Sequence, residues 1–360
     1  MSEFKELVIF YFSGTGNAKQ VALWCSHFAP DYNIVPKILD ISKTDRSVYN
    51  TLPSDSLIII ISPVHGFNFP KITLDFIRRF PEGKNKIVLM NTRAGMRIGK
   101  FVTPGLTGIA FMLSTLILKS KGHKIIGWIP FDMPSNWISI HPALREKTVK
   151  YLHERSHSKL EKYITRIFSG RKAYPAYKDL IQDILISPIS VLYYLFGRFA
   201  FAKSFYASIN CDNCKLCIKS CPVNAIKEIN DRPYWTFDCE SCMKCMNACP
   251  EKAIETSHGL LVIVWFLASA ANSYLIYLML NTYSNNSWIN SITSTIIFFA
   301  FLWFFYKLQQ LVLGQKIIGR LIRYTSLTGY KFWGRYKSIP DYKWMKKNPD
   351  ARGVPGLKKP

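Results

Sequence analysis

Residues 211–222, CDNCKLCIKSCP, and residues 239–250, CESCMKCMNACP, carry the same pattern, C-x2-C-x2-C-x3-C-P, and hold eight of the nine cysteines of the chain. Paired zinc ribbons are one alternative, but they use two pairs of cysteines at longer separation. Disulfide bonds between the cysteines are the other alternative. The chain opens on MSEFKELVIFYFSGTGN, which is not a signal peptide and leads us to expect an intracellular, reducing environment. We therefore expect these cysteines to bind an inorganic cofactor as thiolates.

The spacing resembles that of bacterial two-cluster ferredoxins, in which the fourth cysteine of each run serves the other cluster. The resemblance implies two [4Fe-4S] clusters, the first on Cys211, Cys214, Cys217 and Cys249 and the second on Cys239, Cys242, Cys245 and Cys221. It also implies a hairpin at 227–235 between the repeats and short helices at 223–226 and 251–254. These elements predict a small α+β two-cluster ferredoxin domain over residues 207–258.

Near the start of the chain, the β-rich run LVIFYF (7–12) leads into the turn SGTGNA (13–18) and then into helical spacing. A strand, a Ser/Gly/Thr turn and a helix N-terminus attract phosphate through N–H groups, hydroxyls and the helix dipole. The turn matches neither the Walker loop nor the G-x-G-x-x-G fingerprint. The candidate phosphate-binding residues are Ser13, Gly14, Thr15, Gly16, Asn17 and Ala18.

Further β-rich segments at 33–39, 56–62, 86–91 and 124–130 alternate with helical patterns at 72–80, 106–120 and 142–168. This alternation predicts an α/β fold. Five strands that begin with a phosphate turn resemble flavodoxin, a doubly wound parallel sheet with FMN at the carboxyl ends of its strands. SPVHGFNFP (62–70) and NTRAG (91–95) resemble its two loops beside the flavin ring. The resemblance implies flavin contacts at Pro63, His65, Gly66, Phe67, Asn68, Asn91, Thr92, Arg93, Ala94 and Gly95.

Some of these residues have competing interpretations. Ala18 stands where flavodoxins commonly have a hydroxyl residue, which removes one hydrogen bond to phosphate worth about 1.5–3 kcal/mol. An empty, structural domain is therefore the alternative to FMN binding. Phe67 is the stacking candidate, and Arg93 either favours the anionic reduced flavin or is a solvated charge. We expect His153 and His157, amid charged residues, to lie on a solvated helix rather than on a metal site, and Cys25 to be a small buried hydrophobe.

The segment 259–306 is a run of 48 residues without Asp, Glu, Lys or Arg. Its first 22 residues, 259–280, are long enough as a helix, about 33 Å, to cross a hydrocarbon core of about 30 Å. With 288–306 they predict a transmembrane hairpin of two helices, the alternative being a buried soluble hairpin. The basic residues of 307–360 then place both termini and all cofactors at the cytoplasmic face of the cell membrane. For the apolar stretch 184–201 we expect an interfacial or interdomain helix rather than a third span.

Taken whole, the chain resembles the bacterial and archaeal flavodoxin–ferredoxin fusion proteins over roughly residues 5–256. The expected domains are a flavodoxin-like FMN domain at 1–170, an apolar connector at 171–206, the ferredoxin domain at 207–258, the two membrane helices at 259–306 and a basic cytoplasmic tail at 307–360.

The resemblance implies a membrane-anchored electron-transfer protein, because a flavin takes electrons singly or in pairs whereas each cluster carries one. The formal net charge of +24 suits an acidic redox partner protein and anionic lipid at the cytoplasmic face; we expect no nucleic acid partner. One alternative is a flavin-dependent reductase of a quinone or small molecule, fed by the clusters, with His65 and Arg93 as candidate acid or base. The other is a non-catalytic redox sensor or subunit. An electron carrier is favoured over a substrate-turning enzyme.

Overall fold

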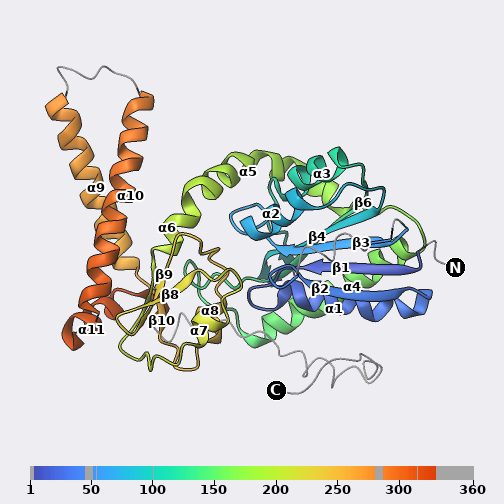
Figure 1. Cartoon of the computed structure of the whole chain (residues 1–360), viewed down its shortest axis with the longest axis horizontal. Coiled ribbons are helices and arrows are strands. Elements are labelled where there is room, and N and C mark those ends of the chain that lie inside the picture. The colour runs from blue at the N-terminus through green and yellow to red at the C-terminus, as the bar shows by residue number, and fades with distance from the viewer. Residues whose placement is uncertain are drawn as a thin grey trace. The chain divides into compact units, whose positions relative to one another are not determined.

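The computed structural model describes residues 4–44, 52–53, 55–99, 101–279, 287–313 and 315–329 (Figure 1). The described residues up to Asn136, together with Ala143–Tyr194, form one compact unit, and Trp137–Pro142 with the described residues from Leu195 onward form a second. The expected boundaries differ from these in two places. Residues 137–142 belong to the second unit, and the connector 171–206 is divided between the two. Most of the expected basic tail, 330–360, lies outside the described residues.

A parallel sheet forms the centre of the first unit. Its strands are β1 (Glu6–Tyr11), β2 (Val35–Asp40), β3 (Leu57–Pro63), β4 (Lys86–Ile98) and β6 (Lys124–Pro134). They lie in the order β2-β1-β3-β4-β6 with every neighbour parallel, which is the flavodoxin order with its switch point between β1 and β3. The short β5 (Phe101–Thr103) pairs antiparallel with the end of β4. The predicted five-stranded doubly wound sheet is confirmed.

Helices cover both faces of this sheet (Figure 1). They are α1 (Asn17–Phe28), α2 (Lys71–Arg79), α3 (Ala110–Ser120) and α4 (Glu146–Phe168). Adjacent residues of β1 show the two faces. Ile9 belongs to the core that contains Val21 of α1 and Ile164 of α4, whereas the ring of Phe10 lies 5.0 Å from that of Phe76 in α2. A strand buried on both faces explains why β1 and β3 read as continuous apolar runs.

The described part of the second unit contains two small antiparallel sheets, with a short helix inside each cysteine motif. β7 (Phe205–Ala207) pairs with β10 (Ile254–Thr256), and β8 (Ile226–Ile229) forms a hairpin with β9 (Arg232–Trp235). The hairpin expected at 227–235 is therefore confirmed. The helices expected at 223–226 and 251–254 are wrong, because α7 (Leu216–Lys219) and α8 (Lys244–Ala248) lie inside the cysteine motifs instead.

Within the described residues, three segments are long and apolar enough to cross a membrane, namely Pro175–Ala202, His258–Leu275 and Trp288–Val312. The last two lie within α9 (His258–Met279) and α10 (Ser287–Val312), which contact each other as a hairpin, and α11 (Lys316–Tyr324) follows. Near the base of this hairpin, Ser257 Oγ donates to Gln309 Oε1 at 2.6 Å. The first segment was not expected to qualify as a span. It comprises a 3-10 turn (Pro175–Asp179), α5 (Leu180–Leu192), a π-helical turn (Tyr193–Gly197) and α6 (Arg198–Ala202).

Candidate iron–sulfur and flavin sites

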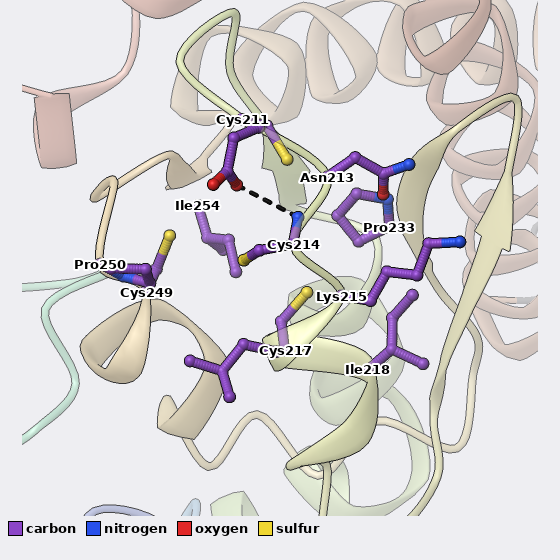
Figure 2. Close-up of a pocket in the computed structure, with 12 residues that line it drawn as sticks. Cys211, Asn213, Cys214, Lys215, Cys217, Ile218, Pro233, Cys249, Pro250 and Ile254 are labelled. Carbon is purple, nitrogen blue, oxygen red and sulfur yellow. Dashed lines mark hydrogen bonds between the residues drawn. The ribbon is translucent and has the colours of Figure 1, made fainter.

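Four cysteines line one pocket of the second unit (Figure 2). Cys211, Cys214 and Cys217 come from the first motif, and Cys249 comes from the end of the second. Among the described residues, no three His, Cys, Asp or Glu side chains converge as a single metal ion would require. Four cysteine thiols around one pocket are the donor set that a [4Fe-4S] cluster uses.

A second set of thiols gathers around the other motif. Burial raises the pKa of Cys242 to about 11, and it raises the pKa of Cys239 and Cys245 as well. The thiols of Cys239 and Cys242 both lie close enough to Cys221 for the negative charges to repel each other. Cys249 therefore lies with the first three cysteines of the first motif, and Cys221 lies with Cys239 and Cys242 of the second. Because coordination to a metal deprotonates a thiol outright, iron would overcome this effect of burial.

The two motifs have the same backbone shape. Asn213 and Ser241 have φ of 58° and 50°, and Lys215 and Met243 both have φ of 60°, so equivalent residues adopt the left-handed conformation. That conformation is uncommon for residues other than glycine. Its repetition at matching positions gives the two loops the same curl between their first and third cysteines.

Backbone N–H groups point at the fourth sulfur of each motif. The N–H of Ala225 donates to Cys221 Sγ and that of Ala253 donates to Cys249 Sγ, both at 3.3 Å. Such bonds stabilise a thiolate, and hydrogen bonds to cysteine sulfur are among the features that set the potential of a cluster. The donor set therefore fits iron–sulfur ligation in both chemistry and arrangement.

Lys203 is a buried cation of the second unit that the sequence patterns did not single out. Its ammonium donates to the Trp235 carbonyl at 2.6 Å. It also lies 4.3–4.8 Å from the centroids of three rings, those of Tyr234, Phe237 and Tyr306. Burial lowers the pKa of Lys203 to about 8, and the negative charge of Cys239 opposes that shift. A positive charge near a cluster ligand favours the addition of an electron there.

In the first unit, the strand–turn–helix predicted for the phosphate turn is confirmed, since β1 ends at Tyr11 and α1 begins at Asn17. Gly16 has φ of 107°, and nothing lies within 4 Å of where its Cβ would be. Ser13 Oγ accepts from the N–H of Gly16 at 3.1 Å, and Thr15 Oγ1 accepts from Asn136 Nδ2 at 2.6 Å. The turn is half-buried and open. The methyl of Ala18 belongs to the core on the other side.

The loop after β3 is a tight turn from His65 to Asn68, closed by two backbone hydrogen bonds of 2.8 and 3.3 Å. Gly66 and Phe67 both have positive φ, as a type I′ turn requires. A Cβ on Gly66 would come within 2.0 Å of the Tyr193 ring. Tyr193 was not predicted as a site residue, and it covers the tip of the loop where the flavin ring was expected.

The expected loop at 91–95 is wrong. Strand β4 continues to Ile98, and Asn91 to Gly95 pair in register with Pro130 to Pro134 of β6. Two long neighbouring strands satisfy these backbone groups within the sheet, so no loop forms there. A Cβ on Gly95 would lie 2.9 Å from the Asp132 Cβ, and this explains the need for glycine.

Arg93 is neither a solvated charge nor open to the outside. Its side chain is 1% exposed, and its Nε and Nη2 donate to Asp132 and Asp179 at 2.8 and 2.7 Å. Its Nη1 donates to Thr107 Oγ1 at 3.2 Å. Protein groups therefore bind all three nitrogens of the guanidinium, and its expected contact with a flavin stays a prediction.

The fit to FMN differs between the two ends of the expected site. At the phosphate end, the open turn from Ser13 to Asn17 matches an anion. At the ring end, Asn91 is fully buried, and its Oδ1 has no hydrogen-bond partner among the described residues. An orphaned buried acceptor is expected to find a donor, and a flavin N–H is a donor of that kind. The phosphate end thus carries the clearer match.

His153 and Cys25 are both buried. His153 is 2% exposed and packs edge-on to the Trp24 ring, with centroids 6.0 Å apart, so the expectation of a solvated histidine there is wrong. The reason is that α4 turns this face toward α1. Cys25 is fully buried, and burial raises the pKa of its thiol, so its prediction as a small buried hydrophobe is confirmed.

Residues 210–254 match the family model of the 4Fe-4S dicluster domain. No curated protein matches the chain in sequence. Three solved structures show the likeness of the first unit. Rubredoxin oxygen:oxidoreductase from Desulfovibrio gigas is 12% identical with a TM-score of 0.29, over 45% of this chain and 36% of that one. Flavodoxin from Fusobacterium nucleatum bound to flavin mononucleotide is 14% identical with a TM-score of 0.31, and the match covers 47% of this chain and 100% of that one. Flavodoxin 1 from Bacillus cereus is 15% identical with a TM-score of 0.28, and the match covers 44% of this chain and 97% of that one.

The assignment of the fold rests on the strand order of the sheet. The order β2-β1-β3-β4-β6 and the dicluster match define the class of protein. The chain joins a flavodoxin-like domain to a 4Fe-4S domain, which confirms the resemblance to flavodoxin–ferredoxin fusion proteins. The dicluster match supports an iron–sulfur protein of the electron-transfer kind, and the flavodoxin-like sheet is a likeness of fold.

Proposed function

We propose that the protein is a membrane-anchored electron carrier that holds one FMN and two [4Fe-4S] clusters on the cytoplasmic face of the cell membrane. The observation that carries the proposal is the exchange of fourth cysteines between the two motifs of a chain that also has a flavodoxin-like sheet. A flavin supplies two-electron chemistry and each cluster supplies one-electron chemistry when bound. The protein would thereby link the two kinds of electron transfer.

The chain's own residues have defined tasks in this proposal. Two sets of four cysteines hold the clusters, with N–H bonds to Cys221 and Cys249 that stabilise the thiolates. The turn from Ser13 to Asn17 binds phosphate through its N–H groups and hydroxyls. Helices α9 and α10 support the membrane anchor, since both are long and apolar enough to span. The basic residues beyond α10 support a cytoplasmic location of the termini.

An acidic redox protein is the proposed partner, because the chain has a net charge of +24 and the expected flavodoxin-like region 1–170 alone has an excess of eleven basic residues. Complementary charge speeds the encounter of two redox proteins and weakens with salt. The measurement is the rate of electron transfer to acidic and basic ferredoxin-type acceptors at rising ionic strength. A rate that does not depend on salt would count against an acidic partner.

Cofactor content tests the central proposal. The full chain, purified anaerobically in detergent, is assayed for iron, acid-labile sulfide and released flavin, and its EPR spectrum is recorded after reduction. About eight iron, eight sulfide and one FMN per chain are expected for two cubane clusters and one flavin. Iron without flavin would leave a membrane-bound ferredoxin on an empty flavodoxin-like domain. Zinc in place of iron would end the redox proposal.

A flavin-dependent reductase of a quinone or small molecule is the second candidate, favoured by the burial of His65 at the turn beside the expected flavin ring. It predicts sustained oxidation of a low-potential donor by a quinone, with loss of turnover in His65→Ala. Turnover that survives this change, or a lack of turnover with intact cofactors, favours the carrier. A sensor subunit instead predicts co-purification with one stoichiometric partner.

A further inference from the structure

Helix α5 buries two of its polar side chains and exposes most of its apolar ones. Asp183 is 4% exposed and Ser190 is fully buried. The outward residues are 45–77% exposed and follow helical spacing; they are Ile181, Ile184, Leu185, Ile189, Val191 and Leu192. A surface helix of a soluble domain normally has the opposite arrangement. This outward face is called the α5 apolar face below.

Polar contacts fix the rotation of α5 on the first unit. Asp183 Oδ1 accepts from the N–H groups of Thr107 and Gly108, both at 2.9 Å. Ser190 Oγ donates to the carbonyl of Phe67 at 2.6 Å. If the helix rotated its apolar face inward, these groups would lose their partners, and an unpaired buried polar group is costly. The hydrogen bonds made by the inward side of the helix therefore keep the apolar face exposed.

The same contacts disfavour α5 as a membrane span, although Pro175–Ala202 has sufficient length and apolar character. To cross a bilayer, the segment would take Asp179 and Asp183 away from Arg93 and from the amides of Thr107 and Gly108. Both carboxylates would then enter hydrocarbon, where charged side chains are costly. A helix that lies along the surface keeps every one of these contacts.

The charges around the α5 apolar face are basic. From Leu180 to Gly197 the sequence has a single charged residue, Asp183, and that one is buried. Lys178 is exposed just before α5, and on α2 Arg78 and Arg79 are exposed, with Arg78 Nη1 3.5 Å from the Tyr194 hydroxyl. The nearby acid, Asp75, forms ion pairs with Lys71 and Arg78. An apolar stripe with basic flanks is complementary to an anionic bilayer surface.

We infer that the α5 apolar face lies in the headgroup–acyl boundary of the membrane that α9 and α10 cross. The inference rests on the proposed membrane anchor, which keeps a bilayer within reach of the first unit. It has a consequence for the expected flavin site. Ser190 and Tyr193 contact the turn at Gly66 and Phe67, so this turn lies beside the lipid surface.

The test uses the full chain in nanodiscs of equal parts phosphatidylcholine and phosphatidylglycerol. A photoreactive p-benzoylphenylalanine replaces Leu185 in one variant and Val35 in the other. The two side chains are matched, being 74% and 69% exposed and both in the first unit. Val35 pairs with Glu6 at the amino end of the sheet, whereas α5 contacts loops at the carboxyl end of the sheet. After irradiation, mass spectrometry identifies the molecules attached at each site.

Lipid adducts at position 185 and none at position 35 are the expected result. Adducts to a second copy of the chain would show that a dimer covers the face and would overturn the inference. The absence of lipid adducts at 185, or equal amounts at both positions, would overturn it too. In parallel, hydrogen exchange is expected to find the amides of Thr107 and Gly108 protected, and rapid exchange there would mean that α5 has left the domain to span.

The failure of the anchor is distinguishable from the failure of the inference. Flotation of the unsubstituted chain with vesicles after an alkaline wash reports on membrane-spanning segments and not on a helix that lies along the surface. A chain that floats but gives no lipid adduct at position 185 keeps the proposed anchor and loses the α5 contact. A chain that does not float loses the anchor, and the inference with it.

Discussion

Replacement of Arg93 by methionine separates a structural role from a flavin role for this residue. The guanidinium is 1% exposed and joins β4 to Asp132 of β6 and Asp179, which precedes α5. Methionine has a similar length but supplies no charge and no donors. Asp132 retains one partner, because its Oδ1 also accepts from the N–H of Gly105 at 2.8 Å. Asp179 loses its ion-pair partner, and Lys159 is a remaining cation near its charge.

The size of the effect follows from this geometry. Removing one partner of a buried ion pair costs about 3–5 kcal/mol, because a charge is left uncompensated. For a domain of this size, each kcal/mol lowers the melting temperature by about 2–4 °C, so a fall of about 6–20 °C is expected. Arg93→Lys keeps the charge but cannot bridge both carboxylates, and the loss of one charged hydrogen bond costs about 1.5–3 kcal/mol.

The assay is pulse proteolysis of the full chain in detergent at rising temperature, with cleavage sites in the first unit identified by mass spectrometry. Arg79→Met, an exposed arginine of α2, is the control and is expected to change stability by about 0.5 kcal/mol or less. Arg93→Met combined with Asp179→Asn is expected to recover part of the loss, because the neutral amide no longer needs a cation. Native stability in Arg93→Met, together with a shifted flavin potential, would refute the structural role.

Three further predictions follow from other parts of the chain. Cys221→Ser is expected to remove the cluster of Cys239, Cys242 and Cys245 and to spare the other, so that iron per chain falls by half. Cys249→Ser is expected to remove the cluster of Cys211, Cys214 and Cys217 instead. If either variant lost the cluster of the motif in which the serine stands, the exchange of fourth ligands would be contradicted. Lys203→Met is expected to lower the midpoint potential of the cluster at Cys239 in an EPR titration, more than Lys203→Arg does, because a buried cation no longer favours reduction; an unchanged potential would limit Lys203 to packing. Burial lowers the pKa of His153 from 6.5 to about 4, so between these values the unfolded chain binds more protons, and the stability of the first unit is expected to fall by up to about 3 kcal/mol as pH drops from about 6.5 to 4. Pulse proteolysis across that range should show a weaker pH dependence in His153→Leu, and an equal dependence in both proteins would contradict the assignment.

The sequence was informative wherever the signal is local along the chain. Cysteine spacing is set by covalent geometry, so the two motifs predicted the dicluster domain that residues 210–254 match. The first strand–turn–helix was predictable because the strand, the glycine turn and the start of the helix lie within twelve residues of one another. Apolar runs of spanning length predicted α9 and α10 for the same reason.

The tertiary structure decided the features that depend on contacts between distant residues. NTRAG continues a strand because β6 pairs with it in register, and Arg93 is buried because Asp132 and Asp179 meet it from 39 and 86 residues away. The inward side of α5 is polar because its partners are loop amides and a carbonyl from residues 67–108, which no periodicity within α5 reveals. Hydropathy reports how apolar a segment is, whereas the direction that its apolar face takes is set by what the opposite face binds.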